Sequence, residues 1–310
     1  FLKNLSMQLK INRPNIWPNL QDEKYVYVIS PAYPNSPAEI DKITLFLKQW
    51  DLKPILFDFP SNNHEPFLAQ SDKLRLAELK NALYGNESNI IMASRGGYGS
   101  ARILPELLKL ESPQSNKLLI GFSDITSLHL CLNNHWGLSS LHGPLLNQCI
   151  TDNINQDTIK NLFNILSGTN KILSYPITGL NNLAKDYQGE AELPPLKGGN
   201  LTLIQTSIGT PWGLDKESKF SMLIEEYDEP TYAIDRSLRH LLHAGTFKNC
   251  EALFIGDISQ KPDTIDAESM NYITQSFIPL LNIPIFRIKN IGHTKRNLAI
   301  PLGIPISISL

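Results

Sequence analysis

The sequence predicts an α/β protein whose first half contains a parallel β-sheet covered by helices on both faces. Short apolar runs of strand length alternate with segments of helical periodicity, which is the pattern of a parallel sheet with helical crossovers. Loops rich in glycine or proline follow several of the apolar runs directly. With 310 residues, the chain is long enough for two domains.

The elements of the first half can be assigned in order. Residues 25–30 are rich in aromatic and β-branched side chains and read as a buried strand. Ser36, Pro37 and Glu39 form a capping box with proline at the first helical position, so a helix begins there. Further strands are expected at 54–57, 89–93 and 117–121, with helices at 72–84, 100–110, 124–134 and 157–166.

The second half is predicted to be a separate domain of mixed strands and helices. Residues 1–166 would form the N-terminal domain, 167–187 a linker without clear periodicity, and 188–310 the C-terminal domain. The C-terminal elements follow from the same apolar patterns. Strands are expected at 221–225, 251–255, 284–288 and 304–309, with helices at 200–207, 232–244 and 266–278.

The composition favours a small-molecule partner over a polyanion. The formal net charge is −2, so no basic excess points to nucleic acid. The three cysteines are far apart in the sequence, which fits a reducing compartment better than a disulfide framework. We see neither a secretory apolar run near the start nor a stretch of about 20 apolar residues for a bilayer. We therefore expect a cytoplasmic protein.

Ser123 follows an apolar strand and precedes a helix. A strand-turn-helix elbow presents a serine hydroxyl at the sheet edge and places the next backbone N–H at a helix N-terminus. Helix capping by Ser123 or Asp124 explains the same residues. The glycine-rich run 94–99 follows the preceding strand, so both loops should lie at one edge of the sheet. It serves either as a tight turn or as a source of backbone donors.

An acid and a histidine in the second half follow apolar strands in the same way. Glu225 comes at the end of one strand and His293 lies in a glycine-containing loop after another. Alone, each is equally consistent with a solvated turn. His240 and His243 have helical spacing, but no third or fourth ligand stands near them, so we expect no metal site. His142 lies in a Leu-His-Gly-Pro loop, where a structural and a functional role both stay open.

Seven segments, in order along the chain, resemble the LD-carboxypeptidase family of serine peptidases, which includes microcin immunity peptidases. The similarity runs from about residue 25 to the C-terminus. Three residues depart from those common in the family, namely Ser94, Glu226 and Tyr227. The matching segments are 94–99, 121–124, 141–144, 198–201, 225–230, 232–236 and 292–293.

The resemblance implies a flavodoxin-like three-layer N-terminal domain, a mixed C-terminal domain and an active site between them. It implies a catalytic triad of Ser123, Glu225 and His293. The oxyanion hole would be formed by the backbone N–H groups of Gly97 and Asp124. No cofactor would be required.

The implied substrate is a murein tetrapeptide that loses its terminal D-alanine during peptidoglycan recycling. Arg102 is a candidate for binding the terminal carboxylate, although a surface ion pair explains it better. Family members often form homodimers, and a homodimer is the oligomer we would test for here.

Three alternatives stay open. The same triad would cleave a peptide–nucleotide antibiotic if Trp212 or Tyr187 supplied an aromatic wall for the base. A non-catalytic peptide- or carbohydrate-binding module would retain the scaffold without turnover. A metallo-hydrolase built on His240 and His243 would be sensitive to chelators.

Overall fold

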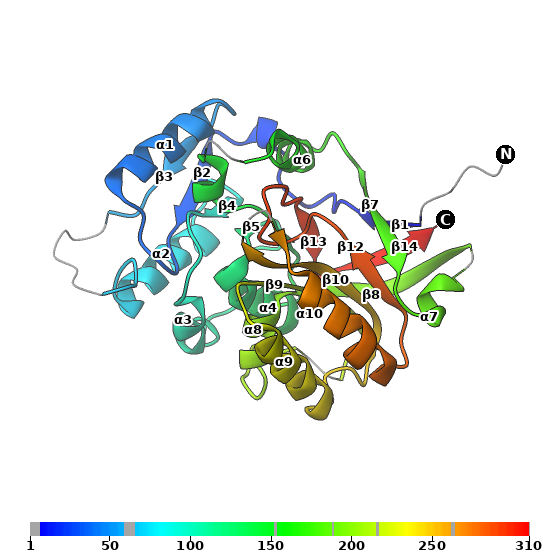
Figure 1. The fold of residues 1–310 in the computed structure, drawn as a ribbon. Helices are drawn as coiled ribbons and strands as arrows, with labels where there is room; N and C mark the ends of the chain where they lie inside the picture. Colours follow the sequence, from blue (N-terminus) through cyan, green and yellow to red (C-terminus); the bar gives the residue numbers. More distant parts are fainter. Residues whose placement is uncertain are drawn as a thin grey trace.

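Two β-sheets form the framework of the protein in the computed structural model (Figure 1). The first and last strands of the chain lie side by side, because Leu9 pairs with Ile308 in antiparallel register. The structure describes residues 7–58, 66–151, 154–187, 189–214, 217–261 and 264–309.

The six-stranded sheet has the strand order β13-β6-β5-β4-β2-β3. The pairings among β3, β2, β4, β5 and β6 are all parallel, so these five strands have the doubly wound order of flavodoxin-like folds. The predicted flavodoxin-like class is therefore confirmed. The strands are β2 (Tyr25–Ile29), β3 (Lys53–Ile55), β4 (Ile90–Ala93), β5 (Leu118–Gly121), β6 (Ser140–His142) and β13 (Ile300–Leu302).

Helices cover both faces of this sheet, as the alternating sequence pattern predicts. Val26 and Val28 pack in one core cluster with Ile43 of α1, whereas Tyr27 and Ile29 point into a second cluster. Both faces are buried because successive strand residues point to opposite sides. The helices are α1 (Pro37–Lys48), α2 (Asp72–Tyr84), α3 (Ser100–Leu107), α4 (Thr126–His135), α5 (Leu146–Cys149) and α6 (Gln156–Leu166).

The eight-stranded sheet has the order β11-β10-β12-β7-β1-β14-β8-β9. An additional β10–β9 pairing closes all of these strands except β11 into a ring. Helices α7 (Asn182–Lys185), α8 (Leu201–Thr206), α9 (Thr231–His243) and α10 (Ala267–Tyr272) belong to this half. The strands are β1 (Gln8–Asn12), β7 (Ile172–Gly179), β8 (Glu190–Asn200), β9 (Phe220–Tyr227), β10 (Cys250–Lys261), β11 (Thr264–Ile265), β12 (Ile285–Ile288) and β14 (Ile304–Ser309).

The structure differs from the sequence prediction at the boundary between the halves. The segment 167–187 is not a plain linker, because it contains β7 and α7. Strand β1 belongs to the ring of the second half, although it comes first in the sequence. Strand β13 crosses the other way and pairs with β6 of the first half. The two halves therefore exchange strands and share one core cluster.

The predicted helix 266–278 is also shorter than expected. The regular α-helix, α10, ends at Tyr272. The chain then forms a π-helical turn (Ile273–Phe277) and a 3-10 turn (Ile278–Leu280). Pro279 lies in the last turn, where its missing N–H removes a hydrogen bond that a regular helix needs.

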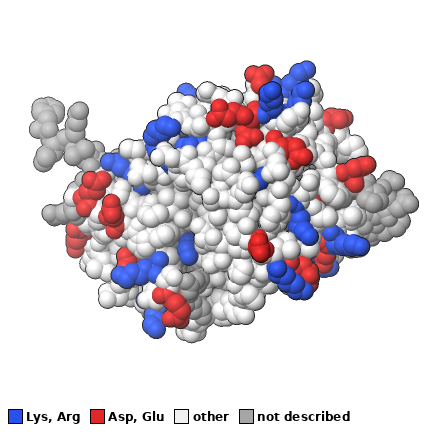
Figure 2. All heavy atoms as spheres, turned by 180° about the vertical axis from the view of Figure 1, so that it is seen from behind, with Lys and Arg blue, Asp and Glu red and all other residues white. Residues whose placement is uncertain are grey.

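The surface carries no large patch of one charge on the face shown in Figure 2, where acidic and basic side chains are interspersed. Within the described ranges, no helix is both long and apolar enough to cross a bilayer.

Strand β1 should be essential for stability. It lies between β7 and β14, and its Leu9 and Ile11 side chains are almost completely buried. Leu9→Ala leaves a cavity in the shared core and should lower the free energy of unfolding by about 2–5 kcal/mol, measured by urea denaturation. Asn12→Ala changes an exposed residue of the same strand and should shift it by less than about 0.5 kcal/mol. Equal effects of the two substitutions would contradict a core role for β1.

Candidate active site

Ser123 lies on a strained turn at the carboxyl end of β5. Its φ is 62°, a left-handed conformation that is uncommon for a residue other than glycine. A 3-10 turn (Ser123–Ile125) follows and leads directly into α4. This strand-turn-helix geometry is that of a nucleophile elbow, and strain of this kind concentrates at functional positions.

The carboxylate of Asp124 ties the elbow to the glycine-rich loop. It accepts hydrogen bonds from the backbone N–H of Gly99 at 3.3 Å and from that of Ser100 at 2.8 Å. Asp124 is 1% exposed, and burial raises the pKa of its carboxyl despite these hydrogen bonds. The loops after β4 and β5 are therefore fixed relative to one another, as their shared sheet edge predicts.

Glu225 and His293 come together from separate strands of the ring. Glu225 lies in β9, His293 follows β12, and His293 Nδ1 lies 2.8 Å from Glu225 Oε2. The Glu225 side chain is fully buried, whereas the imidazole is 15% exposed. Gly292 makes the approach feasible, because its φ is 131° and a Cβ there would lie 3.0 Å from Glu225 Oε2.

The imidazole of His293 lies between two aromatic rings. Tyr227 stacks on it with ring centroids 4.8 Å apart, and Phe122 contacts it in a tilted arrangement at 4.5 Å. Tyr227 is at the end of β9, and Phe122 is the residue before Ser123. The aromatic contacts therefore hold the imidazole beside the elbow, with one ring from each half of the chain.

Ser123 itself is oriented toward the glycine-rich loop. A Cβ built on Gly96 would lie 3.4 Å from Ser123 Oγ, whereas one on Gly97 would collide with the ring of Tyr33. Among the residues that the structure describes, no hydrogen bond joins Ser123 Oγ to His293. In the absence of substrate, a hydrogen bond between a nucleophile and its base is often long or poorly aligned, and it tightens when substrate binds.

Two residues that the sequence did not single out, Asp257 and Asn297, hold the histidine loop in place. Asp257, within β10, accepts hydrogen bonds from Thr294 at 3.1 Å and from Arg287 at 2.8 Å. Asn297 accepts one from the backbone N–H of Gly292 at 3.1 Å. Asp257 follows an apolar strand as Glu225 does, and that repeated pattern was the only sequence signal for it.

Comparison with known proteins identifies the family. Residues 26–143 match the profile of the LD-carboxypeptidase N-terminal domain, and residues 194–308 match that of the C-terminal domain. The chain belongs to the LD-carboxypeptidase family. It is therefore a serine carboxypeptidase, a hydrolase that acts on peptide bonds.

Curated relatives of this LD-carboxypeptidase cover most of its length. A putative carboxypeptidase of Rickettsia conorii is 37% identical over 75% of this chain and 71% of its own. A probable murein peptide carboxypeptidase of Bacillus subtilis is 30% identical, over 90% and 86%. A murein tetrapeptide carboxypeptidase of Pseudomonas aeruginosa is 28% identical, over 90% and 91%.

Solved structures share the fold. The muramoyltetrapeptide carboxypeptidase of Oxalobacter formigenes has a TM-score of 0.71 and 24% identity, over 92% of this chain and 99% of that one. The microcin C7 self-immunity protein has a TM-score of 0.73 and 17% identity, over 96% and 99%. The two-domain α/β architecture of this LD-carboxypeptidase is therefore common to enzymes of both names.

The other candidate residues named from the sequence contact neighbouring side chains of the fold. Arg102 forms an ion pair with Asp72 at 3.0 Å, as expected of a helix-surface arginine. Tyr187 packs edge-on against Phe286 at 5.9 Å, and Trp212 packs against a core cluster. His240 Nδ1 lies 2.6 Å from the side-chain amide of Gln205, and the described residues hold no group of three metal-ligating side chains.

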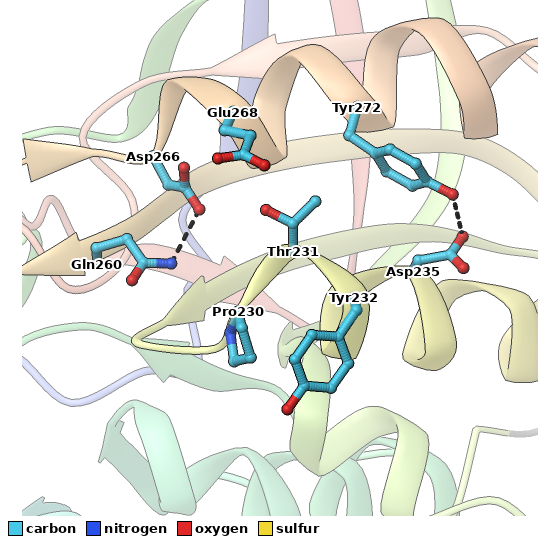
Figure 3. Close-up of a pocket in the computed structure, with 8 residues that line it drawn as sticks. All are labelled: Pro230, Thr231, Tyr232, Asp235, Gln260, Asp266, Glu268 and Tyr272. Atoms are coloured by element: carbon cyan, nitrogen blue, oxygen red, sulfur yellow. Dashed lines mark hydrogen bonds between the residues drawn. The ribbon is translucent and has the colours of Figure 1, made fainter.

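A hollow of about 700 Å³ opens beyond the end of β9, between α9 and α10 (Figure 3). Three acids line it, Asp235, Asp266 and Glu268, and the first two have hydrogen-bond partners within the fold. Asp235 accepts hydrogen bonds from Tyr272 at 2.7 Å and from Arg239 at 3.0 Å. Asp266 accepts one from Gln260 at 3.0 Å and caps α10. We therefore interpret these two carboxylates as structural.

A second hollow, of about 720 Å³, lies beside the histidine loop and is basic. Its lining includes Thr294, the residue after His293, and Asp257, which accepts a hydrogen bond from Thr294. Asp257 is the one acid in its lining. The basic residues that line it are Arg287, Lys289, Lys295 and Arg296.

The charge of Glu225 should make stability depend on pH. Burial alone would raise the pKa of this carboxyl, but the adjacent His293 and His142 outweigh burial and lower it to about 2. Since an unfolded glutamate has a pKa of about 4.3, the charged form stabilises the fold above that value and its contribution is lost as pH falls toward 2.

Glu225→Gln removes this titration. Between about pH 6 and pH 2, the free energy of unfolding of the wild type should therefore fall more steeply than that of Glu225→Gln, as measured by urea denaturation. Glu251→Gln changes a partly exposed acid on β10 and should follow the wild type. Parallel curves for wild type and Glu225→Gln would show that the carboxylate is not stabilised by its buried partners.

Proposed function

We propose that this LD-carboxypeptidase uses Ser123, His293 and Glu225 to release the terminal D-alanine from murein tetrapeptides. The observation that carries the proposal is the 2.8 Å contact between the buried Glu225 and His293, held beside a serine in a left-handed elbow. The relatives named murein peptide and murein tetrapeptide carboxypeptidases support the choice of substrate. Such a peptide would be met in the cytoplasm during peptidoglycan recycling.

In the proposed mechanism, Ser123 Oγ attacks the carbonyl carbon of the L-centre that precedes D-alanine. His293 takes the hydroxyl proton as the new C–O bond forms and returns it to the leaving amine as the C–N bond breaks. Glu225 holds the imidazole through Nδ1, which leaves Nε2 as the atom that exchanges the proton, and stabilises the imidazolium. Water then hydrolyses the acyl-enzyme by the same route.

The oxyanion would be stabilised by the backbone N–H groups of Gly97 and Asp124. Asp124 N belongs to the first turn of the helical segment after Ser123, where the helix dipole favours negative charge. The proximity of Gly96 to Ser123 brings the glycine-rich loop to the same point. One donor of this kind contributes about 3 kcal/mol to transition-state stabilisation in another serine peptidase.

Ser123→Ala should lower kcat for D-alanine release from a murein tetrapeptide by about 10³-fold or more, because the nucleophile is lost while the binding surface remains. Release of D-alanine is measured by chromatography, and tetrapeptide binding by calorimetry should be retained. Ser127→Ala, a buried serine one turn along α4, is the matched control and should stay within a few-fold of wild type.

Unchanged turnover by Ser123→Ala would overturn the proposed function. If the wild-type protein binds the tetrapeptide but does not hydrolyse it, the protein is instead a non-catalytic binding module. Turnover of a peptide–nucleotide conjugate without turnover of the tetrapeptide would assign the same triad to the other substrate class.

We also propose that the basic hollow beside the histidine loop binds the terminal carboxylate of the peptide. A carboxypeptidase must recognise that carboxylate close to the scissile bond, and cationic side chains do so most strongly. Arg102 is engaged by Asp72. Lys289 is exposed at the hollow and, among the described residues, has no acid within ion-pair distance.

Lys289→Ala should raise KM for the tetrapeptide about tenfold with little change in kcat, because it removes an interaction that is equal in the ground and transition states. A substrate with an amidated C-terminus should bind wild type and Lys289→Ala equally. Lys248→Ala, an exposed lysine elsewhere, is the control. An unchanged KM would remove Lys289 from substrate binding without affecting the triad.

A further inference from the structure

Three buried polar atoms without hydrogen-bond partners lie together behind the candidate active site. They are Nδ1 and Nε2 of His142 and Oε1 of Glu225. His142 Nε2 is 3.9 Å from Glu225 Oε1, and both side chains are 0% exposed. A buried polar atom that lacks a partner is costly, so two such atoms facing one another at this distance need an explanation.

The surroundings of His142 fix its position. Its backbone pairs with Gly121 of β5 and with Ile300 of β13, so it lies in the sheet directly beside the elbow strand. The ring of Phe122 contacts its imidazole edge-on at 5.6 Å. A Cβ on Gly199 would lie 3.4 Å from its Cδ2, so the backbone of β8 closes the other side. The imidazole is therefore confined next to Glu225.

We propose that His142 is a positioning residue that donates a hydrogen bond from Nε2 to Glu225 Oε1 during the reaction. The carboxylate would then be held by two imidazoles, with His142 on one oxygen and His293 on the other. A small displacement of either side chain is enough to close the 3.9 Å separation. This inference rests on the proposed function of Glu225 as the partner of the catalytic histidine.

The other charged or titratable groups near this pair are already engaged. His129, with its ring centroid 6.3 Å from that of His142, contacts Ser140 and the carbonyl of Gly121. Burial lowers the pKa of His129 to about 3, so it is neutral.

The neighbouring carboxylates also have partners. Glu226 accepts hydrogen bonds from Asn200 and Thr202. Asp257 is paired with Arg287. His293 occupies only Oε2 of Glu225.

The proposed contact would act on the proton transfer through Glu225. A carboxylate with both oxygens satisfied keeps one orientation and presents Oε2 to His293 in a fixed direction. It is also a weaker base than a carboxylate with one free oxygen, so it draws the proton of the imidazolium less strongly. Losing His142 should therefore affect the chemical step and its pH dependence, and leave substrate binding unchanged.

The test compares His142→Leu with His142→Gln, which keeps an N–H donor near the position of Nε2. For tetrapeptide hydrolysis, His142→Leu should lower kcat about 10²-fold with KM unchanged, and His142→Gln should recover most of that loss. The acidic limb of the kcat/KM profile should move to higher pH in His142→Leu by roughly half a unit or more. His129→Gln, another buried histidine, should not move it.

A double-mutant cycle separates this role from packing. If His142 acts through Glu225, His142→Leu should cost almost nothing further in a Glu225→Gln background. Additive losses, an unmoved acidic limb, or equal activity of His142→Leu and wild type would each overturn the proposal. If His142→Leu does not fold, as judged by circular dichroism and thermal unfolding, the same cycle is run with His142→Asn, whose shorter side chain does not bring a donor to the position of Nε2.

A readout without substrate keeps this inference distinct from the proposed function. NMR titration of the His293 imidazole should show its midpoint at higher pH in His142→Leu than in wild type, whether or not murein peptides are cleaved. An unchanged midpoint overturns the proposal for His142. A shifted midpoint in an enzyme that does not depend on Ser123 would leave the inference standing and reject the function.

Discussion

The active-site half of the ring is organised around one buried negative charge. Glu225 is completely excluded from solvent, and an uncompensated carboxylate in that position would be strongly destabilising. Among the residues that the structure describes, its one hydrogen bond to a side chain is with His293, which lies 68 residues later in the loop after β12. Folding therefore has to bring the strand and the loop into register before the charge can be buried, which couples the stability of this region to the geometry of the proposed catalytic pair.

The histidine loop is built to meet that requirement. Gly292 has the backbone conformation and the lack of a side chain that let the loop pass close to Glu225. Asn297 holds the backbone of Gly292, and Asp257 holds Thr294 on the other side of the imidazole. These contacts fix the backbone on both sides of His293. The imidazole therefore needs only the contact with Glu225 to fix its orientation.

The sequence was sufficient for four of the five parallel strands, β2 to β5, and for the segments that contain the candidate site residues. Strands β2, β4 and β5 are continuous apolar runs, whereas β6 has only three residues, two of them polar, and gives no such signal. Helix α2 begins and ends where its capping serine and following glycine predict. The ring was harder to foresee. Strand β7 alternates buried and exposed residues in a segment with Pro176 and terminal glycines, and β1 is five residues long. Their role depends on pairings with residues more than 100 positions away, which local patterns do not encode.

In the candidate site, too, some features follow from local sequence patterns and others depend on residues far apart in the sequence. The strand-elbow-helix pattern placed Ser123 and the Asp124 turn, because that signal lies within a few consecutive residues. The contacts that orient His293 could not be read in this way, since Phe122 follows β5 of one sheet whereas Tyr227 and Glu225 belong to β9 of the other. Asp124 has a structural role and a proposed chemical role. Its carboxylate holds the glycine-rich loop, and its backbone N–H is the group proposed for the oxyanion hole, so one residue can support the scaffold and the proposed chemistry at the same time.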